Sequence, residues 1–252
     1  MLPEQDWLHK AKRLAVGMTS RTYHGNEGRA NLTIGNMSDR WYAWCHRCHE
    51  GGVVQKEHVR FGEALAVQDT NPEKPLDAVK VDGSEYEEYV EAFLASKNMA
   101  SEYLPRLWYS PSRKRLLVGT DGGQWHGRDI TGKASTKWMN YGTDQVAGNL
   151  DLITVVVEDI FSMYKVRWAS RGQPDVGVLC ALGTQIKPAV VRRLMHCKGI
   201  VWMFDADAAG DAGSSMGRIR LGPFVDTQGR VRPPEGLDPK DMTIEQIREA
   251  LY

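Results

Sequence analysis

Carboxylates follow two apolar, strand-like segments of the chain and recur in a third segment. VWMF runs into Asp205 and Asp207, LITVVV runs into Glu158, and LDPKD supplies Asp238 and Asp241. Residues two apart in a strand point to the same side, and ligands of open α/β sheets bind at the carboxyl ends of strands. Three such segments would form one negatively charged cleft, in which carboxylates repel unless a cation neutralises them. Hard oxygen ligands suit Mg²⁺, or Mn²⁺, so the pattern predicts a divalent-metal site.

Each acidic residue also has a purely structural interpretation. Asp207 stands before AAGDAG, where it could simply cap the amino end of a helix, and Asp211 fits a first-turn helix acid. Glu158 could be an exposed residue after a buried strand, with Asp159 as its solvated neighbour. The order of the set, Glu, then Asp-x-Asp, then Asp-Pro, each after a strand-like segment, favours the metal interpretation.

A cysteine pair indicates a second metal site with softer ligands. Cys45 and Cys48 form the CHRC of WYAWCHRCHEGG, which predicts a small ribbon closed by a CxxC turn. Cys180 and Cys197 lie alone and far away in sequence, so no disulfide framework is indicated.

Charge is balanced overall but unevenly distributed. With 32 basic and 32 acidic residues, the net charge of zero offers no bulk argument for a nucleic-acid partner. Residues 61–100 are acidic, whereas the next segment, 101–142, is basic. Its basic side chains are Arg106, Arg113, Lys114, Arg115, Arg128, Lys133 and Lys137. This asymmetry favours a local anion-binding face.

No apolar run approaches the roughly 20 residues that cross a bilayer, and the first residues lack the pattern of a signal peptide. We therefore expect a cytoplasmic protein with no membrane partner.

Hydrophobic patterning predicts the elements that must position these residues. Residues 1–55 form a first module, and 56–103 an acidic linker followed by the helix EYEEYVEAFLASKNM. Residues 104–150 form a β-rich basic subdomain, whose strands RLLVGT and KWMNYG are separated by the turns of DGGQWHGRDITGK. From 151 to 252, strands and helices alternate, which predicts an α/β fold with a parallel sheet. The chain closes with a helix over TIEQIREALY that carries a capping box.

The motifs VVVEDIFSMYKV, VLCALGTQIKPAVV, VWMFDADAAGDAG and LDPKDM resemble those of the TOPRIM domain, which bacterial and phage primases, topoisomerases and some nucleases share. The resemblance covers about residues 150–245 and implies a TOPRIM parallel-sheet domain. It implies catalytic, Mg²⁺-binding roles for four carboxylates, Glu158, Asp205, Asp207 and Asp238. One departure is Lys240, at a position where primases often carry a second acid, which bears on a second metal position.

The preceding segment, YSPSRKRLLV and QWHGRDITGKASTKWMNYG, is similar to the basic subdomain that precedes TOPRIM in primases. The positions that match its motif are Arg128, Lys137 and Asn140. The resemblance implies nucleotide- or template-binding roles for Arg113, Lys114, Arg115, Arg128, Lys137 and Asn140. A solvated hairpin turn at RKR and a surface position for Lys137 are the structural alternatives.

The N-terminal segment YHGNEGRANLTIGNMSDRWYAWCHRCHEGG is similar to the primase zinc ribbon. The resemblance implies one Zn²⁺ with His24, Cys45 and Cys48 among its ligands. Arg21 stands where the ribbon has its first cysteine, and structural zinc normally takes four protein ligands.

Three arrangements are open for this ribbon. The site is incomplete and open to water, or a neighbour such as His46 or His49 completes it, or the ribbon binds no metal. In the last case we expect it to be held by packing around Trp41, Tyr42 and Trp44.

Together the resemblances imply a DNA primase of the bacterial or phage type. Such a DNA-directed RNA polymerase is a nucleotidyltransferase that makes short RNA primers from ribonucleoside triphosphates on single-stranded DNA during replication. Mg²⁺ would activate the 3′-hydroxyl, or Glu158 would accept its proton. The sequence has no GxxxxGK[ST] loop, so unwinding would need a separate replicative helicase. A phage-encoded protein would act in the cytoplasm of its bacterial host.

Two other functions fit parts of the sequence. A TOPRIM nuclease would use the same metal-binding carboxylates to hydrolyse a phosphodiester, although the basic segment disfavours it. A catalytically silent, primase-like nucleic-acid-binding protein would explain both Lys240 and the missing zinc ligand at Arg21.

Overall fold

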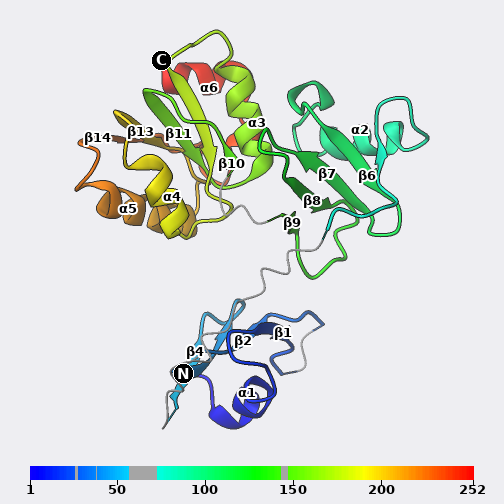
Figure 1. Cartoon of the computed structure of the whole chain (residues 1–252), viewed down its shortest axis with the longest axis vertical. Helices are drawn as coiled ribbons and strands as arrows, with labels where there is room; N and C mark the ends of the chain where they lie inside the picture. The colour runs from blue at the N-terminus through cyan, green and yellow to red at the C-terminus, as the bar shows by residue number, and fades with distance from the viewer. Residues whose placement is uncertain (26–27, 38, 57–72, 143–146) are drawn as a thin grey trace. The chain divides into compact units, whose positions relative to one another are not determined.

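The structure is a computed structural model, and it describes residues 1–25, 28–37, 39–56, 73–142 and 147–252. The chain forms two compact units, Met1–Thr70 and Asn71–Tyr252 (Figure 1). The linker predicted over 56–103 includes residues 57–72, which lie outside the described residues. No helix of the described segments has both the length and the apolar composition needed to cross a membrane.

The first unit is a four-stranded antiparallel sheet with a helix packed against it (Figure 1). Its elements are α1 (Glu4–Ala11), β1 (Thr19–Thr22), β2 (Leu32–Asn36), β3 (Arg40–Cys45) and β4 (Gly51–Gln55), with strand order β1-β2-β3-β4. Trp7 of α1 is fully buried on the sheet. Gly52 of β4 allows this contact, because a Cβ at that position would lie 2.8 Å from the indole ring.

The core of this unit is centred on Trp7 rather than on the aromatic residues of β3. Side chains alternate along a strand, so Trp41 and Ala43 point to the face that α1 covers, whereas Tyr42 and Trp44 point to the other face. Trp41 packs at the edge of the core, and Trp44 is 41% exposed. Packing around all three aromatic residues was expected only for a metal-free ribbon, and this core contains Trp41 but not Tyr42 or Trp44.

The second unit contains two sheets, the first of which is antiparallel. Its elements are β5 (Val79–Lys80), α2 (Glu87–Ala95), η1 (Ser101–Tyr103), β6 (Leu107–Ser110), β7 (Arg115–Gly119), β8 (Trp125–Asp129) and β9 (Trp138–Tyr141), with strands in sequential order. Strand β8 lies in the glycine-rich segment that the sequence predicted as turns only. Its pairing on both sides, to β7 and β9, overrides the low strand propensity of that segment.

The second sheet is mixed, with strand order β10-β12-β11-β13-β14. Its strands are β10 (Ala147–Gly148), β11 (Ile153–Val157), β12 (Val176–Cys180), β13 (Gly199–Trp202) and β14 (Thr227–Arg230). The helices are α3 (Ile160–Ala169), α4 (Pro188–Leu194), α5 (Ala208–Leu221), η2 (Pro239–Asp241) and α6 (Ile244–Leu251). Four strands run parallel as predicted, but β10 pairs antiparallel with β12 at one edge, so the sheet is not purely parallel.

Helices cover both faces of this mixed sheet. Val155 and Val157 of β11 point toward α3 and α6, whereas Val156 points toward α4 and α5. Fully buried side chains of this size contribute roughly 1.5–3 kcal/mol each relative to exposure. The near-continuous apolar runs of β11 and β13 are what a strand buried on both faces requires.

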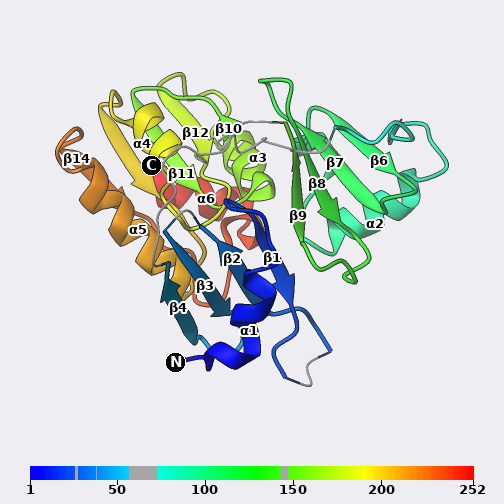
Figure 2. The same ribbon diagram turned by 60° about the horizontal axis from the view of Figure 1, so that its bottom comes forward.

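The two sheets of the second unit share one apolar core, and α3 lies between them in both views (Figures 1 and 2). Phe161 of α3 packs edge-on against Trp138 of β9, with ring centroids 5.0 Å apart. The hydroxyl of Tyr164 donates a hydrogen bond to the Gly119 carbonyl at 2.7 Å. These contacts place the β8–β9 face beside the amino end of α3, which begins just after β11.

Candidate active site and candidate metal centre

Two neighbouring parallel strands of the second unit lead into carboxylates. In the pairing of β11 with β13, Val156 lies opposite Trp202, so the carboxyl ends of both strands meet at one edge of the sheet. Glu158 follows β11 directly. The backbone N–H of Met203 still donates to the Val156 carbonyl at 2.8 Å, and Asp205 comes two residues later. We call Glu158 and Asp205 the acidic edge.

Both carboxylates of the acidic edge are half-buried and hold protons more tightly than usual. Desolvation raises the pKa of Glu158 to about 7, and the charges of Asp159 and Asp207 add to this rise. Desolvation also raises the pKa of Asp205 to about 7, with repulsion from Glu158 as the next contribution. The positive charge of Lys240 lowers both values but does not offset burial and repulsion.

The acidic edge contains a carboxylate oxygen that could bind a cation. Oδ1 of Asp205 is buried and has no hydrogen-bond partner among the described residues. A divalent ion would accept this oxygen as a ligand and remove the repulsion with Glu158. The carboxylates do not yet converge as ligands, since none belongs to a described group of three whose ligand atoms all lie within 4.8 Å of one another.

Two further aspartates cap the helices that begin at this edge. Asp207 accepts a hydrogen bond from the Gly210 N–H at 2.7 Å and caps α5, as its structural interpretation predicted. Asp159 accepts from the Ser162 N–H at 2.9 Å and caps α3. Gly210 lets α5 begin against the preceding chain, because a Cβ there would lie 2.2 Å from the Asp205 carbonyl oxygen. Asp207 is exposed, and its role as a metal ligand stays a prediction.

Asp159 belongs to this site, although the sequence predicted only a solvated neighbour. It is half-buried, and its charge raises the pKa values of Glu158 and Asp205. Its charge also favours the protonated forms of Arg128 and Lys137. The available signal was its place at a strand-to-helix junction, because an N-cap carboxylate is held at the helix end and cannot turn away.

Asp238 lies in a different environment from the acidic edge. Its Oδ2 forms an ion pair with Nζ of Lys240, whose side chain is 6% exposed. The same Nζ lies 3.7 Å from Oδ2 of Asp241. The third acidic segment is therefore partly neutralised by its own lysine.

Two cations of the neighbouring sheet lie near these carboxylates. The charge of Asp159 acts on both Arg128 and Lys137, and that of Asp205 acts on Lys137, which is exposed just before β9. Arg128 of β8 is buried beside Trp138, with its guanidinium 5.4 Å from a ring centroid. Nε of Arg128 has no hydrogen-bond partner among the described residues. Desolvation lowers the pKa of Lys137, with Arg128 and Lys240 adding to this and Asp205 opposing it. An anion bound between these cations would be favoured electrostatically.

A cavity of about 210 Å³ opens beside Glu158. Its lining comprises His126, Trp138, Asn140, Glu158, Asp159, Ile160, Leu182 and Gly183. Asn140 and His126 are joined by a hydrogen bond of 2.8 Å between Oδ1 and Nδ1. The cavity thus combines an indole, a polar pair and a carboxylate of the acidic edge.

The other predicted basic residues lie elsewhere on the first sheet of this unit. Arg113 and Lys114 are exposed in the turn between β6 and β7. Arg115 is buried and donates to the Gly127 carbonyl at 3.0 Å and to two further backbone carbonyls. Leu116 pairs with Arg128 in the sheet, and Arg115 directly precedes Leu116. Side chains alternate along a strand, so Arg115 and Arg128 project from opposite faces. Nucleotide or template binding by these three residues stays a prediction, and Arg115 already has a structural role.

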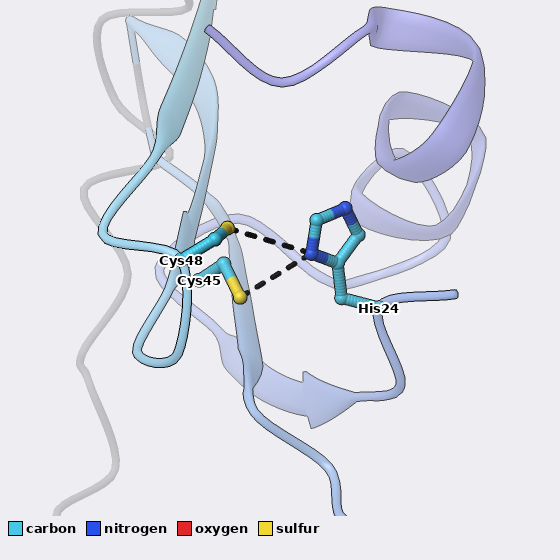
Figure 3. Close-up of side chains that lie close together, drawn as sticks. All are labelled: His24, Cys45 and Cys48. Atoms are coloured by element: carbon cyan, nitrogen blue, oxygen red, sulfur yellow. Dashed lines mark hydrogen bonds between the residues drawn. The ribbon is translucent and has the colours of Figure 1, made fainter. Parts of the chain in front are cut away.

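The first unit holds a preassembled group of soft ligands. His24 follows β1, Cys45 ends β3, and Cys48 lies in the turn to β4 (Figure 3). Nδ1 of His24 lies 3.3 Å from Sγ of Cys45 and 3.6 Å from Sγ of Cys48. The ligand atoms of these three residues all lie within 4.8 Å of one another, and no other group of three or more candidate ligands among the described residues does so. The group could therefore bind a metal ion.

The pKa values of the two cysteines shift in opposite directions. Burial raises the pKa of Cys45, but hydrogen bonds from the backbone of Cys48 and Arg47 and from the side chains of Cys48 and His24 bring it down to about 7. The hydrogen bond to Cys45 raises the pKa of Cys48. One thiolate is thus nearly available at neutral pH, as a soft metal ligand must be.

The structure supplies no fourth protein ligand from the predicted neighbours. His46 donates or accepts a hydrogen bond of 2.9 Å with the Thr33 hydroxyl. Arg21 lies on β1 opposite Thr33, and its charge contributes to the lowered pKa of His46 after desolvation. Within the described residues, neither His46 nor His49 belongs to the group of converging ligands. The converging group thus consists of three ligands, and zinc binding by it stays a prediction.

No protein-family model and no curated protein matches this chain. Among solved structures, the chain is similar to a DNA primase domain from Pseudomonas aeruginosa, with 19% identity over 57% of this chain and 52% of that one and a TM-score of 0.44. This chain thus spans about half the length of the Pseudomonas structure.

Two further structures match along most of the chain. The Aquifex aeolicus primase, with zinc-binding and RNA polymerase domains, is 16% identical over 96% of this chain and 81% of that one, with a TM-score of 0.45. The primase fragment of the bacteriophage T7 primase-helicase is 13% identical over 92% of this chain and 97% of that one, with a TM-score of 0.43. All three are bacterial or phage primases, the family that the sequence resembles. At these identities and TM-scores the likeness does not establish function, which has to be inferred from the side chains of the site.

Proposed function

We propose that this chain is a DNA primase that synthesises short RNA primers on single-stranded DNA by Mg²⁺-dependent nucleotidyl transfer. The observation that carries the proposal is the acidic edge, where the charge of Lys137 acts on both carboxylates and Oδ1 of Asp205 is buried without a partner among the described residues. Carboxylates that hold a divalent ion, beside cations that hold phosphates, are what phosphoryl-group transfer requires.

The residues of the site would divide this work as follows. Glu158 and Asp205 would hold Mg²⁺, with Asp207 at the edge of the same site. Bound Mg²⁺ would lower the pKa of the attacking 3′-hydroxyl and neutralise charge on the triphosphate. Arg128, which is buried, and Lys137, which is exposed, would bind phosphate oxygens, because a bound anion would be attracted to both charges. The polar lining of the adjacent cavity, including Asn140, would orient the nucleotide.

The proposal extends to the organisation of the chain. Residues 151–252 would be a TOPRIM domain, 104–150 the basic primase subdomain that precedes it, and 1–55 a zinc-ribbon module. The mixed sheet with helices on both faces supports the first of these, although β10 runs antiparallel. The group in Figure 3 supports the last, with Zn²⁺ as the ion that suits two sulfur ligands and an imidazole. Its substrates would be ribonucleoside triphosphates and a DNA template, with a separate helicase as partner.

One assay tests the proposal directly. Labelled ribonucleoside triphosphates, single-stranded DNA and the full chain should yield short RNA products with Mg²⁺ and none with a chelator. Nuclease activity would instead shorten the single-stranded DNA, which is end-labelled in a parallel reaction under the same conditions. Template binding without either product would identify a catalytically silent protein and overturn the proposal.

A further inference from the structure

Lys240 is a buried lysine in the acidic DPKD segment, and it is held by carboxylates on both sides. Its side chain is 6% exposed, and its Nζ pairs with Oδ2 of Asp238 and lies 3.7 Å from Oδ2 of Asp241. Lysine is almost never fully buried unless its charge is paired. The burial of Lys240 therefore depends on this aspartate pair.

The backbone around Lys240 is fixed by hydrogen bonds that also occupy Asp241. Oδ2 of Asp241 accepts from the Asp238 N–H at 3.2 Å, and its Oδ1 accepts from Nδ2 of Asn98 at 3.1 Å. Nζ of Lys165 donates to the Lys240 carbonyl at 2.6 Å. Both oxygens of Asp241 thus have other hydrogen-bond partners, and Asp238, the N-cap of η2, is the carboxylate that pairs most closely with Lys240.

The charge of Lys240 also reaches the acidic edge. It lowers the pKa values of both Glu158 and Asp205, so its ammonium lies within electrostatic range of both carboxylates. In contrast with Asp238, Asp205 keeps a buried oxygen without a partner among the described residues. The Lys240 ammonium thus pairs with Asp238, whereas the buried oxygen that lacks a partner in the described segments belongs to Asp205.

We propose that the Lys240 ammonium is a permanent cation of this site that withdraws Asp238 from metal binding, so that the acidic edge holds one divalent ion rather than two. The inference rests on the proposed metal site at Glu158 and Asp205. For Asp238 to become a ligand, Lys240 would have to give up its closer carboxylate partner while staying buried, and it would keep only Asp241, whose Oδ2 lies 3.7 Å away. Weakening the pairing of a buried charge is destabilising, so the lysine competes with a second metal ion for Asp238.

Mn²⁺ binding to the full, zinc-loaded chain tests the inference without relying on activity. Free Mn²⁺ can be counted by its electron paramagnetic resonance signal for the wild type and for the Asp205→Asn, Asp238→Asn and Lys240→Gln variants. We expect the wild type to bind one Mn²⁺. The Asp205→Asn variant should bind it at least about tenfold more weakly, and the affinity of Asp238→Asn should change little. Lys240→Gln should release Asp238 and either add a second Mn²⁺ or tighten the first about tenfold. Lys133→Gln, at an exposed position, is the matched control.

The outcomes separate this inference from the proposed function. If Asp238→Asn weakens Mn²⁺ binding as much as Asp205→Asn does, or if Lys240→Gln binds Mn²⁺ as the wild type does, Lys240 does not exclude a metal ion and the inference is overturned alone. Mn²⁺ binding that is absent from the wild type or insensitive to Asp205→Asn would overturn the proposed metal site and the inference together. If a single variant fails to fold by circular dichroism, the double variant Asp238→Asn/Lys240→Gln, which removes the ion pair as a unit, should bind one Mn²⁺. Loss of that ion would contradict the inference.

Discussion

The His24–Cys45–Cys48 group and the acidic edge are both suited to metal ions, but the chain prepares them in opposite ways. Ligand atoms of the first group already lie within 4.8 Å of one another, joined by hydrogen bonds. Hydrogen bonds bring the pKa of Cys45 down to about 7, whereas burial and repulsion bring those of Glu158 and Asp205 up to about 7. Thiol and imidazole groups can share protons and assemble without a metal, but bare carboxylates repel, so nearby cations have to stabilise them.

The largest effect that this comparison predicts is for Asp205→Asn. Primer synthesis should fall on the order of a hundredfold to a thousandfold, because losing a metal ligand removes several kcal/mol of transition-state stabilisation. The metal-free variant should be at least as stable as the wild type, since a half-buried, repelled carboxylate is gone. Activity assays and thermal unfolding with a chelator measure the two effects. Full activity in the variant would remove the acidic edge from the catalytic site.

Cys45→Ser tests the preassembled group. Protein purified without chelator should carry about one zinc ion, and the variant should lose it, because a serine hydroxyl is a poor zinc ligand. Elemental analysis measures the metal, and hydrogen exchange of the described residues between 19 and 56 should increase. Cys197→Ser, in the other unit, is the control. A wild-type protein that lacks zinc yet stays protected would mean that packing on Trp7 holds the ribbon alone.

The pH dependence should run in opposite directions in the two units of metal-free protein. The raised pKa values of Glu158 and Asp205 stabilise the second unit at low pH, and this contribution is lost as pH rises from about 4 through 7. The lowered pKa of Cys45 stabilises the first unit at high pH, and this contribution is lost as pH falls through 7. Hydrogen exchange at about pH 5 and about pH 8, corrected for intrinsic rates, measures both. Parallel trends in the two units would contradict the comparison.

The same protonation equilibrium should govern metal affinity at the acidic edge. Below pH 7, Mn²⁺ affinity should fall by up to about tenfold per pH unit for each proton that the ion must displace. Titrations at several pH values measure this slope, and a flat profile between about pH 5 and about pH 7 would exclude Glu158 and Asp205 as ligands.

A smaller effect is expected from Lys137 and Arg128, the cations on which the charge of Asp159 acts. Lys137→Ala and Arg128→Ala should each weaken binding of single-stranded DNA or nucleotide and reduce the salt slope by about one, as when a phosphate contact is lost. Lys133→Ala, at an exposed position in the same segment, should leave the slope unchanged. If the salt dependence of binding has the same slope in all three variants and in the wild type, Lys137 and Arg128 do not contact phosphate.

The smallest effect separates the two roles of Asp207. Asp207→Ala should lower the free energy of unfolding by about 1 kcal/mol through loss of the α5 cap, whereas Asp207→Asn should be nearly silent in stability. If Asp207 is also a metal ligand, both variants should lose primer synthesis. An Asp207→Asn protein with full activity would leave the cap as its sole role.

Several elements could be predicted from the sequence because their signals are local. The apolar runs LITVVV and VWMF correspond to β11 and β13, although β13 ends at Trp202, and the carboxyl ends of both strands meet at one edge. The capping box of the last helix is confirmed by the reciprocal hydrogen bonds of Thr243 and Gln246, at 2.8 and 3.1 Å. Strand β8 escaped prediction, because its segment is rich in glycine and its pairing partners are distant in sequence.

The sequence by itself determined which side chains stand at strand ends and in the CxxC turn, because spacing along the chain sets both. Only the tertiary structure decided their states. Burial and mutual repulsion raise the pKa values of Glu158 and Asp205, and these depend on packing between segments far apart in sequence. The structure likewise decided that Lys240 neutralises Asp238 and that Trp7 forms the core of the first unit. Hydrophobic pattern and turn chemistry act through neighbours along the chain, whereas desolvation and charge pairing act through neighbours in space.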